Sequence, residues 1–317
     1  MMRPIDRQDL EEPQEYTYTG GLKCICCEQW VSQNDQSCKF CQTPIGLSVS
    51  ASQRRGRSRF FSVLGASNAG KTVYLGLLLD LLSKGSDRLR GLATGAFSVS
   101  LQHQVVTALE GRTFPDKTPN EADHWKWLHC QVTVSGAEGE RHLDLIAPDF
   151  AGEAIASEIE QAGVFPAIRH VVAKSAGLLI LVDSVKVRDA GPSEDLFAMK
   201  MAAYIAQSQD CLPDPGCGPR GDGPGVAIVF TKSDGCREAE RDATAFAATH
   251  TPRLLEFCRQ AFERHKFFAA GVVGSGGTLI DAAGRRLNVP LHVEPRGVSE
   301  PLEWLVCNSK PERLYVG

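Results

Sequence analysis

Residues 65–72 read Gly-Ala-Ser-Asn-Ala-Gly-Lys-Thr, which is a complete G-x-x-x-x-G-K-[ST] pattern. An apolar run of strand-forming residues precedes it at 59–64, and the apolar stretch 73–82 that follows is suited to a buried helix. A strand, a glycine-rich loop and a helix in this order form the context in which the pattern binds phosphate. The stretch therefore predicts a phosphate-binding loop at the start of an α/β domain.

The fixed positions of this loop each have a physical role. Gly65 and Gly70 allow the backbone to turn its N–H groups toward phosphate oxygens, and the dipole of the following helix adds positive charge at the same place. Lys71 contributes a full charge, and the Thr72 hydroxyl is placed to ligate a phosphate-bound Mg²⁺. The expected nucleotide contacts in the loop are Gly65, Ser67, Asn68, Ala69, Gly70, Lys71 and Thr72.

The composition is that of an ordinary soluble protein, with 43% hydrophobic and 23% charged residues among 317. A formal net charge of −4 disfavours a nucleic-acid partner for the surface as a whole, although the segment 20–46 and the basic residues Arg54–Arg59 leave local contacts open. We expect no membrane span, because no stretch approaches the ~20 apolar residues that a span requires. The first residues lack the apolar core of a secretory signal, so a cytoplasmic location is expected.

Four segments differ in composition. Residues 1–19 predict a flexible tail, 20–46 a zinc ribbon, 47–58 a polar, basic linker, and 59–310 the α/β domain. From residue 59 onward, strand and helix patterns alternate, which predicts a mainly parallel sheet with helices on both faces. Strands are expected at 59–64, 128–134, 142–148, 178–184, 226–231 and 267–273, and helices at 71–84, 98–110, 166–175, 194–208, 239–263 and 300–307. The Gly- and Pro-rich segment 209–225 predicts an exposed loop.

The zinc ribbon is predicted from cysteine spacing. Cys24 and Cys27 form one C-x-x-C pair, and Cys38 and Cys41 form a second after ten intervening residues. Two such knuckles can bring four thiolates into a tetrahedron around Zn²⁺. Cys26 is the spare cysteine, and a register that uses it remains open. Four thiolates leave no free coordination position, so the metal is expected to be structural.

Two later segments carry further candidate nucleotide contacts. A strand delivers Asp149, and the sequence D-x-x-G ends at Gly152. Asp149 can hold Mg²⁺ through a water, and the Gly152 N–H can meet a γ-phosphate oxygen, a contact that exists only with a triphosphate. The second segment follows another apolar strand as Thr231-Lys232-Ser233-Asp234, a variant of the Asn-Lys-x-Asp guanine loop. A carboxylate there can accept hydrogen bonds from guanine N1–H and the exocyclic amine.

A third, softer signal is the small-residue stretch that follows the expected strand 267–273. Gly274, Ser275 and Gly276 would let a backbone N–H approach guanine O6. Ser275 is the residue expected at that contact. Glycine-rich strand ends also occur for other reasons.

The order of these motifs resembles the translation-factor-related (TRAFAC) class of P-loop GTPases. Within that class the chain is most similar to bacterial double-GTPase-type domains, which often occur in conflict or defence gene neighbourhoods. The resemblance covers about residues 59–307 and implies binding of GTP or GDP with Mg²⁺. It implies phosphate and Mg²⁺ roles for Lys71 and Thr72, a second switch at Asp149 and Gly152, and guanine reading by Thr231, Lys232 and Asp234.

The family also has a threonine in a first switch loop, between the first helix and the strand that ends at Asp149. Thr113 and Thr118 both lie in that interval. Thr118, which Pro119 follows, resembles the family more closely and would join Thr72 and Asp149 at the Mg²⁺.

Two residues depart from the family pattern. Thr231 stands where the family has Asn, so we expect the loss of an amide that braces the base loop, and weaker guanine binding. Glu153 stands where many small GTPases have a water-orienting Gln, and a carboxylate repels a γ-phosphate unless it is protonated or turned away. Slow hydrolysis is expected, with a partner supplying a further group such as an arginine. The residues expected to act in catalysis are Lys71, Thr118, Gly152 and Glu153.

These expectations describe a regulatory GTPase whose switch loops act on a protein effector or an activating partner. Two alternatives stay open. In a P-loop ATPase, Asp234 would be incidental, and ATP would be preferred over GTP. A nucleotide-binding adaptor would bind GTP without hydrolysing it.

Overall fold

The computed structural model describes residues 21–53, 58–86, 88–136, 139–210, 223–280 and 286–308, and an eight-stranded sheet organises most of them. In spatial order the strands run β10-β9-β8-β7-β3-β6-β5-β4. Their bounds are β3 (Ser58–Gly65), β4 (Leu89–Ala93), β5 (Lys126–Gly136), β6 (Gly139–Asp149), β7 (Ser175–Asp183), β8 (Gly225–Thr231), β9 (His265–Ile280) and β10 (Arg286–Arg296).

The centre of the sheet is parallel. β9, β8, β7, β3 and β6 lie side by side in one direction, β5 and β4 continue antiparallel beyond β6, and β10 forms an antiparallel hairpin with β9. The central strands β7 and β8 are buried almost throughout, as parallel strands covered on both faces are. The predicted fold class, a mainly parallel α/β sheet of the P-loop type, is confirmed.

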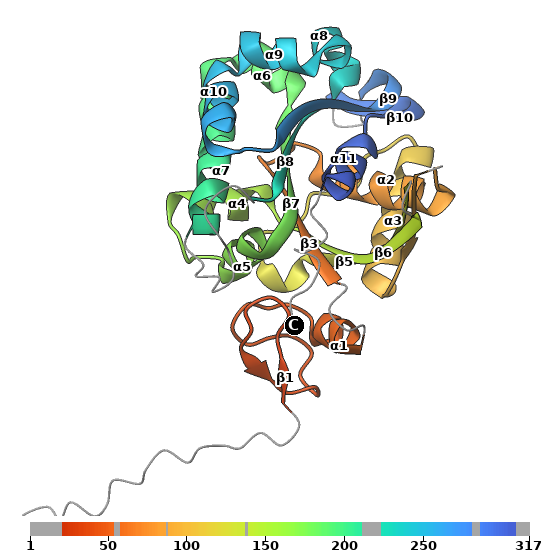
Figure 1. Cartoon of the computed structure of the whole chain (residues 1–317). Coiled ribbons are helices and arrows are strands. Elements are labelled where there is room, and N and C mark those ends of the chain that lie inside the picture. The colour runs from red at the N-terminus through yellow and green to blue at the C-terminus, as the bar shows by residue number, and fades with distance from the viewer. Residues whose placement is uncertain are drawn as a thin grey trace, which may run out of the picture.

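Helices cover both faces of the sheet, each face with its own hydrophobic cluster. On one face lie α2 (Lys71–Lys84), α3 (Ala96–Glu110) and α11 (Glu300–Cys307). On the other lie α4 (Gly152–Glu160), α5 (Pro166–Lys174), α7 (Pro192–Asp210), α9 (Ala243–His250) and α10 (Pro252–Ala261). In Figure 1, α2 and α3 lie to the right of the sheet and α7 and α10 to the left.

The expected single helix at 239–263 is three helices in the structure. α8 (Arg237–Arg241) ends before Asp242, whose side chain accepts hydrogen bonds from two backbone N–H groups at the start of α9. Pro252 then opens α10. Both residue types favour helix starts, so these local signals divide a stretch whose apolar pattern alone suggested continuity.

The expected strand 267–273 is longer than predicted. β9 continues to Ile280 because it pairs with β10, a strand that was not expected from the sequence. Other elements not expected from sequence are the edge strand β4, the helices α4 and α6 (Ser184–Ala190), and the short 3₁₀ turns η1 (Ala122–His124) and η2 (Ser233–Gly235).

The cysteine-rich segment folds against the α/β domain. It consists of a small antiparallel pair, β1 (Leu22–Lys23) and β2 (Trp30–Val31), followed by α1 (Ile45–Gln53), which occupies most of the expected linker 47–58. In Figure 1 it lies below the sheet, beside α5.

Three contacts join this segment to α5. The buried Cys26 Sγ lies 3.9 Å from the Ala167 carbonyl oxygen, within hydrogen-bond range for a thiol. Lys174 Nζ donates to the Ile25 carbonyl at 3.4 Å and pairs with Glu28 at 2.6 Å.

Some expectations fall outside the described part of the chain. These are the tail 1–19, Arg54 to Arg57 of the basic linker, and residues 211–222 of the loop expected at 209–225. Among the helices of the described ranges, none is long and apolar enough to cross a membrane.

Candidate nucleotide and metal sites

The phosphate loop connects β3 to α2 by a tight turn. Asn68 and Gly70 have φ angles of 65° and 85°, in the left-handed region, which turns the backbone sharply before the helix begins. A side chain at Gly65 would bring a Cβ to 2.8 Å from the Leu181 carbonyl oxygen, so the start of the loop is pressed onto β7. The loop is therefore held by the centre of the sheet, as a preformed phosphate cradle requires.

Lys71 lies inside this loop. Its ammonium donates to the carbonyl oxygens of Gly65 at 2.9 Å and Ala66 at 3.0 Å, and the residue is only 7% exposed. Burial lowers the pKa of Lys71 to about 8, while the carboxylates of Asp149 and Glu153 act in the opposite direction. A desolvated ammonium at the base of the loop is suited to pairing with phosphate oxygens.

Three predicted Mg²⁺ residues meet at the start of α2. The Thr72 hydroxyl lies 2.8 Å from the Thr118 hydroxyl, and both donate to Asp149 Oδ2 at 2.9 Å. Asp149 Oδ1 is buried without a hydrogen-bond partner, and burial raises the pKa of this carboxyl. Two hydroxyls and a carboxylate with a free oxygen fit the oxygen ligands of Mg²⁺.

The two candidate switch threonines differ in position. Thr113 is exposed. Its hydroxyl donates to the Ala108 carbonyl in the last turn of α3 at 3.0 Å. Only Thr118 reaches Thr72 and Asp149.

Gly152 packs directly on the phosphate loop. A Cβ added to it would lie 2.3 Å from the Ser67 backbone nitrogen, closer than real Cβ atoms come. The loop containing Gly152 thus lies against Ser67 in a space that only glycine fits.

Glu153, the next residue, forms an ion pair with Lys117 of the loop that carries Thr118. The hydrogen bond from Lys117 is the main reason why the pKa of Glu153 lies below its ordinary value. The carboxylate is held as an ion beside its own counter-charge, and the bare negative charge expected from the sequence is compensated.

The base loop corrects one expectation. The Thr231 hydroxyl donates to the Ala69 carbonyl at 2.9 Å and lies 3.3 Å from the Val182 carbonyl. The side chain therefore ties the end of β8 to the phosphate loop, and the brace expected to be lost with the family's Asn is present in another form. The Thr231 hydroxyl makes a hydrogen bond to the phosphate loop in place of the missing amide.

Asp183 is a site residue that was not expected from the sequence. It ends β7, is 6% exposed, and accepts hydrogen bonds from the Val185 and Lys186 N–H groups at the start of α6. Its Oδ2 lies 2.6 Å from Lys232 Nζ, and Lys232 itself has a left-handed φ of 57°. An aspartate that follows an apolar strand and precedes Ser184 was the available sequence signal.

Asp234 faces β9. Its Oδ1 accepts the Val272 N–H at 3.3 Å, and a Cβ on Gly271 would lie 3.0 Å from the same oxygen. Partial burial raises the pKa of Asp234, and the backbone N–H groups around it oppose that shift. These contacts orient the carboxylate beside the end of β8.

Ser275 does not hold the position expected for it. β9 aligns Ala270 with Thr231, so Gly271 and Val272 lie next to the base loop. Ser275 lies farther along the continuing strand, where its backbone pairs with His292 of β10, and its side chain is outside the described part of the structure. The expectation placed the contact after the end of a strand at 273, whereas β9 continues to Ile280 through its pairing with β10, and the residues next to the base loop lie earlier in the strand.

The four predicted zinc ligands converge. The Sγ atoms of Cys24, Cys27, Cys38 and Cys41 all lie within 4.8 Å of one another. The Cys24–Cys41 and Cys27–Cys38 sulfur distances are 3.6 and 3.5 Å, near the separation of about 3.8 Å that a tetrahedron of ~2.3 Å Zn–S bonds gives. Cys26 is not one of these four and its sulfur lies 3.9 Å from the Ala167 carbonyl of α5, so the register with Cys24 fits a zinc ribbon better than the register with Cys26.

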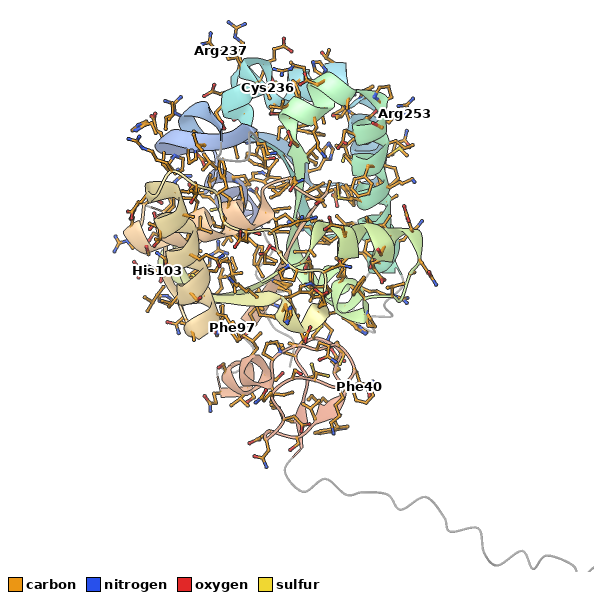
Figure 2. All side chains as sticks on the ribbon, turned by 180° about the vertical axis from the view of Figure 1, so that it is seen from behind. Phe40, Phe97, His103, Cys236, Arg237 and Arg253 are labelled. Carbon is orange, nitrogen blue, oxygen red and sulfur yellow. The ribbon has the colours of Figure 1, made fainter. Side chains whose placement is uncertain are left out.

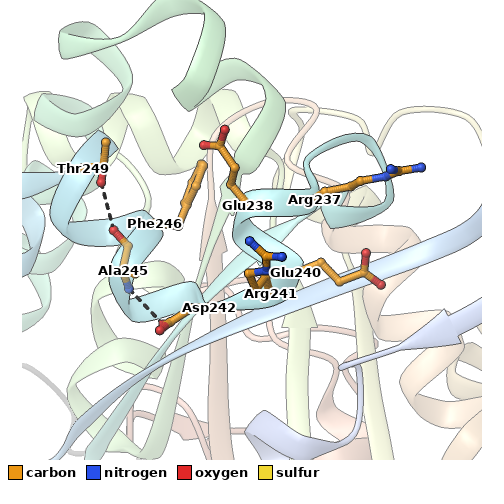
Figure 3. Close-up of a pocket in the computed structure, with 8 residues that line it drawn as sticks. All are labelled: Arg237, Glu238, Glu240, Arg241, Asp242, Ala245, Phe246 and Thr249. Carbon is orange, nitrogen blue, oxygen red and sulfur yellow. Dashed lines mark hydrogen bonds between the residues drawn. The ribbon is translucent and has the colours of Figure 1, made fainter.

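A pocket lined by residues that follow the base loop in the chain contains none of the predicted nucleotide or zinc ligands. Charged side chains of α8 and the start of α9 line it, together with Phe246 (Figure 3). Its lining residues are Arg237, Glu238, Glu240, Arg241, Asp242, Ala245, Phe246 and Thr249. Figure 2 shows Arg237 and Cys236 at the end of the molecule opposite Phe40 of the cysteine-rich segment.

Comparison with known proteins gives one family and several distant structures. Residues 62–213 match the family model of double-GTPase 1, and no curated protein sequence matches the chain.

The bacterial selenocysteine-specific elongation factor EF-Sec is 14% identical, with 67% of this chain and 25% of that chain covered and a TM-score of 0.32. The Arl6 BBS3 small GTPase of Trypanosoma brucei is 11% identical, with 80% of this chain and 97% of that chain covered and a TM-score of 0.33. The GTPase-like domain of Ski7 from S. cerevisiae, bound to GTP, is 14% identical, with 70% of this chain and 44% of that chain covered and a TM-score of 0.38. Residues 62–213, which carry the phosphate loop and Asp149, thus belong to the double-GTPase 1 family of GTP-binding proteins.

Proposed function

We propose that this protein is a Mg²⁺-dependent GTP switch that hydrolyses GTP slowly and signals to a protein partner. The observation that carries the proposal is that Thr72 and Thr118, from two separate segments, both donate to the same carboxylate oxygen of Asp149, from a third. This arrangement places two hydroxyls and one carboxylate beside the phosphate loop, where they could ligate the Mg²⁺ of a nucleoside triphosphate.

Binding and hydrolysis would use the following groups of this chain. Lys71 and the loop N–H groups stabilise negative charge on the phosphoryl oxygens, and water is the nucleophile. Thr72, Thr118 and Asp149 would hold Mg²⁺, which would supply positive charge to offset the negative charge of the phosphate oxygens. The Gly152 N–H would meet the γ-phosphate, next to the Ser67 backbone on which Gly152 packs.

Guanine selectivity would come from Asp234 and Lys232. The Asp234 carboxylate is oriented by the Val272 N–H and can accept from both guanine N1–H and the exocyclic amine. Adenine offers neither donor in that geometry. The Lys232 stem would lie over the base while its ammonium remains paired with Asp183.

The switch would operate through the loop with Thr118 and the segment from Asp149 to Glu153. Thr118 contacts Asp149 beside the phosphate loop, and Gly152 packs on Ser67 within it, so both segments would lie next to a γ-phosphate. Loss of the γ-phosphate would remove contacts from both. The partner is proposed to be a protein that senses this change. A setting in bacterial conflict or defence is also proposed, with the family resemblance as its support, and the zinc ribbon would serve a structural role.

A non-hydrolysing adaptor is the second candidate, and the observation that favours it is the Lys117–Glu153 ion pair. A Glu153 side chain engaged with Lys117 does not serve as the water-orienting group that a glutamine provides in many small GTPases. Turnover no faster than in buffer, together with tight GTP binding, would distinguish the adaptor from the slow GTPase.

The decisive experiment compares the affinities of GTP, XTP and ATP for the wild type and Asp234→Asn, with Mg²⁺ present. Guanine reading predicts that the variant loses GTP and gains XTP, since xanthine presents an acceptor where guanine has its amine. An unchanged GTP preference in Asp234→Asn removes the base assignment. A wild type that prefers ATP establishes the ATPase alternative instead.

A further inference from the structure

The ion pair between Lys117 and Glu153 joins the two candidate switches. Lys117 directly precedes Thr118 in the loop between α3 and β5, and Glu153 directly follows Gly152 in the first turn of α4. Lys117 Nζ donates to Glu153 Oε1, and the two side chains are 58% and 42% exposed. Among the ion pairs of the described residues, this one connects the residues adjacent to both Thr118 and Gly152.

The pair lies close enough to the phosphate loop to act on its charges. Gly152 touches Ser67, so the first turn of α4 starts on the loop itself. The Ser67 side chain also lowers the pKa of Glu153, and the charges of Glu153 and Lys117 shift the pKa of Lys71 in opposite directions. An uncompensated carboxylate in this position would therefore repel the last phosphate of a bound triphosphate.

We infer that Lys117 is a positioning residue that acts through Glu153: by neutralising this carboxylate and holding it to the first switch loop, it lets both switches close over a triphosphate. The inference rests on the proposed GTP-binding function. Lys117 is not assigned a direct contact with phosphate. Its effect depends on the presence of the Glu153 charge, and this dependence separates it from a simple phosphate-binding lysine.

The experiment is a double-mutant cycle on the full chain with Lys117→Met, Glu153→Gln and the double variant. The affinities of GTP and GDP with Mg²⁺ are measured, together with the single-turnover hydrolysis rate. Lys117→Met should weaken GTP roughly tenfold and GDP much less, because a like charge is then left beside the γ-phosphate position. In the Glu153→Gln background, Lys117→Met should cause no further tenfold loss, because the charge that needs compensation is gone.

Two further variants control for other causes. Lys117→Arg retains the pair and should bind GTP within about threefold of the wild type. Lys84→Met removes an ordinary surface pair with Asp80 at the end of α2 and should leave nucleotide binding unchanged. Because both members of the Lys117–Glu153 pair are exposed, thermal unfolding should show the cycle variants folded.

The outcomes separate this inference from the proposed function. If Lys117→Met weakens GTP equally in the wild-type and Glu153→Gln backgrounds, Lys117 contacts the phosphate directly and the inference is wrong, while the GTP-binding function stands. If the wild type binds no GTP, the proposed function and the inference fall together. A loss that appears only when Glu153 is charged supports both.

Discussion

The Thr231 hydroxyl donates a hydrogen bond to the Ala69 carbonyl at 2.9 Å, so the base loop and the phosphate loop are tied by one side chain. Ala69 and Thr231 are 162 positions apart in the sequence. The bond fixes how far the loop that ends at Asp234 lies from the loop that holds Lys71. A nucleotide that spans both loops then binds a base loop and a phosphate loop whose separation is already fixed in the free protein.

Thr231→Val should therefore weaken nucleotide binding. The substitution keeps the size and β-branching of the side chain and removes its buried hydroxyl, which costs about 1 kcal/mol of stability. Because the lost bond joins two parts of the same site, GTP affinity should also fall by about fivefold. Calorimetric binding and thermal unfolding measure the two effects.

Thr251→Val is the matched control for this change. Thr251 is also fully buried, and its hydroxyl donates to the Ala247 carbonyl at 3.3 Å, at the junction of α9 and α10. It should lose stability without losing GTP affinity. Equal affinity losses in both variants would mean that general destabilisation, and not the tie between the loops, weakens binding.

A methyl group at Gly152 should disturb the second switch. In Gly152→Ala the new Cβ meets the Ser67 backbone nitrogen at 2.3 Å, and backbone atoms cannot move aside as a flexible side chain can. Overpacking of this kind costs about 1–3 kcal/mol, and here it separates the switch from the phosphate loop. We expect GTP affinity to fall more than GDP affinity.

Gly46→Ala provides the comparison for Gly152→Ala. A Cβ at Gly46 in α1 meets no atom within 4 Å, so this change should preserve nucleotide binding. It should also stabilise the helix slightly. Wild-type GTP affinity in Gly152→Ala would show that the switch does not rest on Ser67 when the nucleotide is bound.

The pH dependence of binding should reflect Lys71. Its pKa of about 8 means that the free protein loses this charge as the pH rises above 8, whereas a bound phosphate favours the charged form. Binding above pH 8 must then take up a proton, so affinity should fall by up to about tenfold per pH unit.

The measurement is the GTP dissociation constant between pH 7 and pH 9.5 for the wild type and Lys71→Arg. Arginine stays charged throughout this range, so its profile should be flatter than that of the wild type, whatever its absolute affinity. This comparison also removes any titration of the nucleotide itself. Parallel profiles would assign the pH dependence to another group.

Sequence was a good guide where a function depends on residues close together in the chain. The phosphate loop and the two C-x-x-C pairs are local patterns, and the structure places the loop between β3 and α2 and brings the four predicted sulfur atoms together. Thr118 was selected by the following Pro119, and the structure brings it to Thr72. The central strands were readable because strands buried on both faces are continuously apolar.

Sequence was a poor guide at irregular strands and where the decisive partner is distant. β10 alternates apolar and polar residues over 286–294, but Pro290 and Pro295 are unusual inside a strand, and the extension of β9 at 274–280 is rich in glycine and does not alternate. The edge strand β4 is short. It contains Gly91, where any larger residue would place its Cβ only 2.9 Å from Cys130 Sγ. The roles of Asp183 and Thr231 depend on Lys232 and Ala69, contacts that only the folded sheet creates.

The cysteine cluster should distinguish ligand from packing residue. Cys24→Ser with Cys38→Ser removes one thiolate from each knuckle, so zinc content should fall to background. The segment 21–53 should then unfold, and α5 should lose protection from hydrogen exchange, because Cys26 and Lys174 no longer hold the ribbon against it. Unchanged zinc content in this double variant would remove the zinc site.

Cys26→Ala tests the other half of the assignment. Its buried sulfur lies 3.9 Å from the Ala167 carbonyl oxygen and does not belong to the group of four converging sulfur atoms, so this variant should keep a full equivalent of zinc. It should lose about 1 kcal/mol of stability from the loosened contact with α5, which thermal unfolding and hydrogen exchange over residues 166–174 would report. Loss of zinc from Cys26→Ala would instead make Cys26 a ligand and would exclude Cys24 or Cys27 from the site.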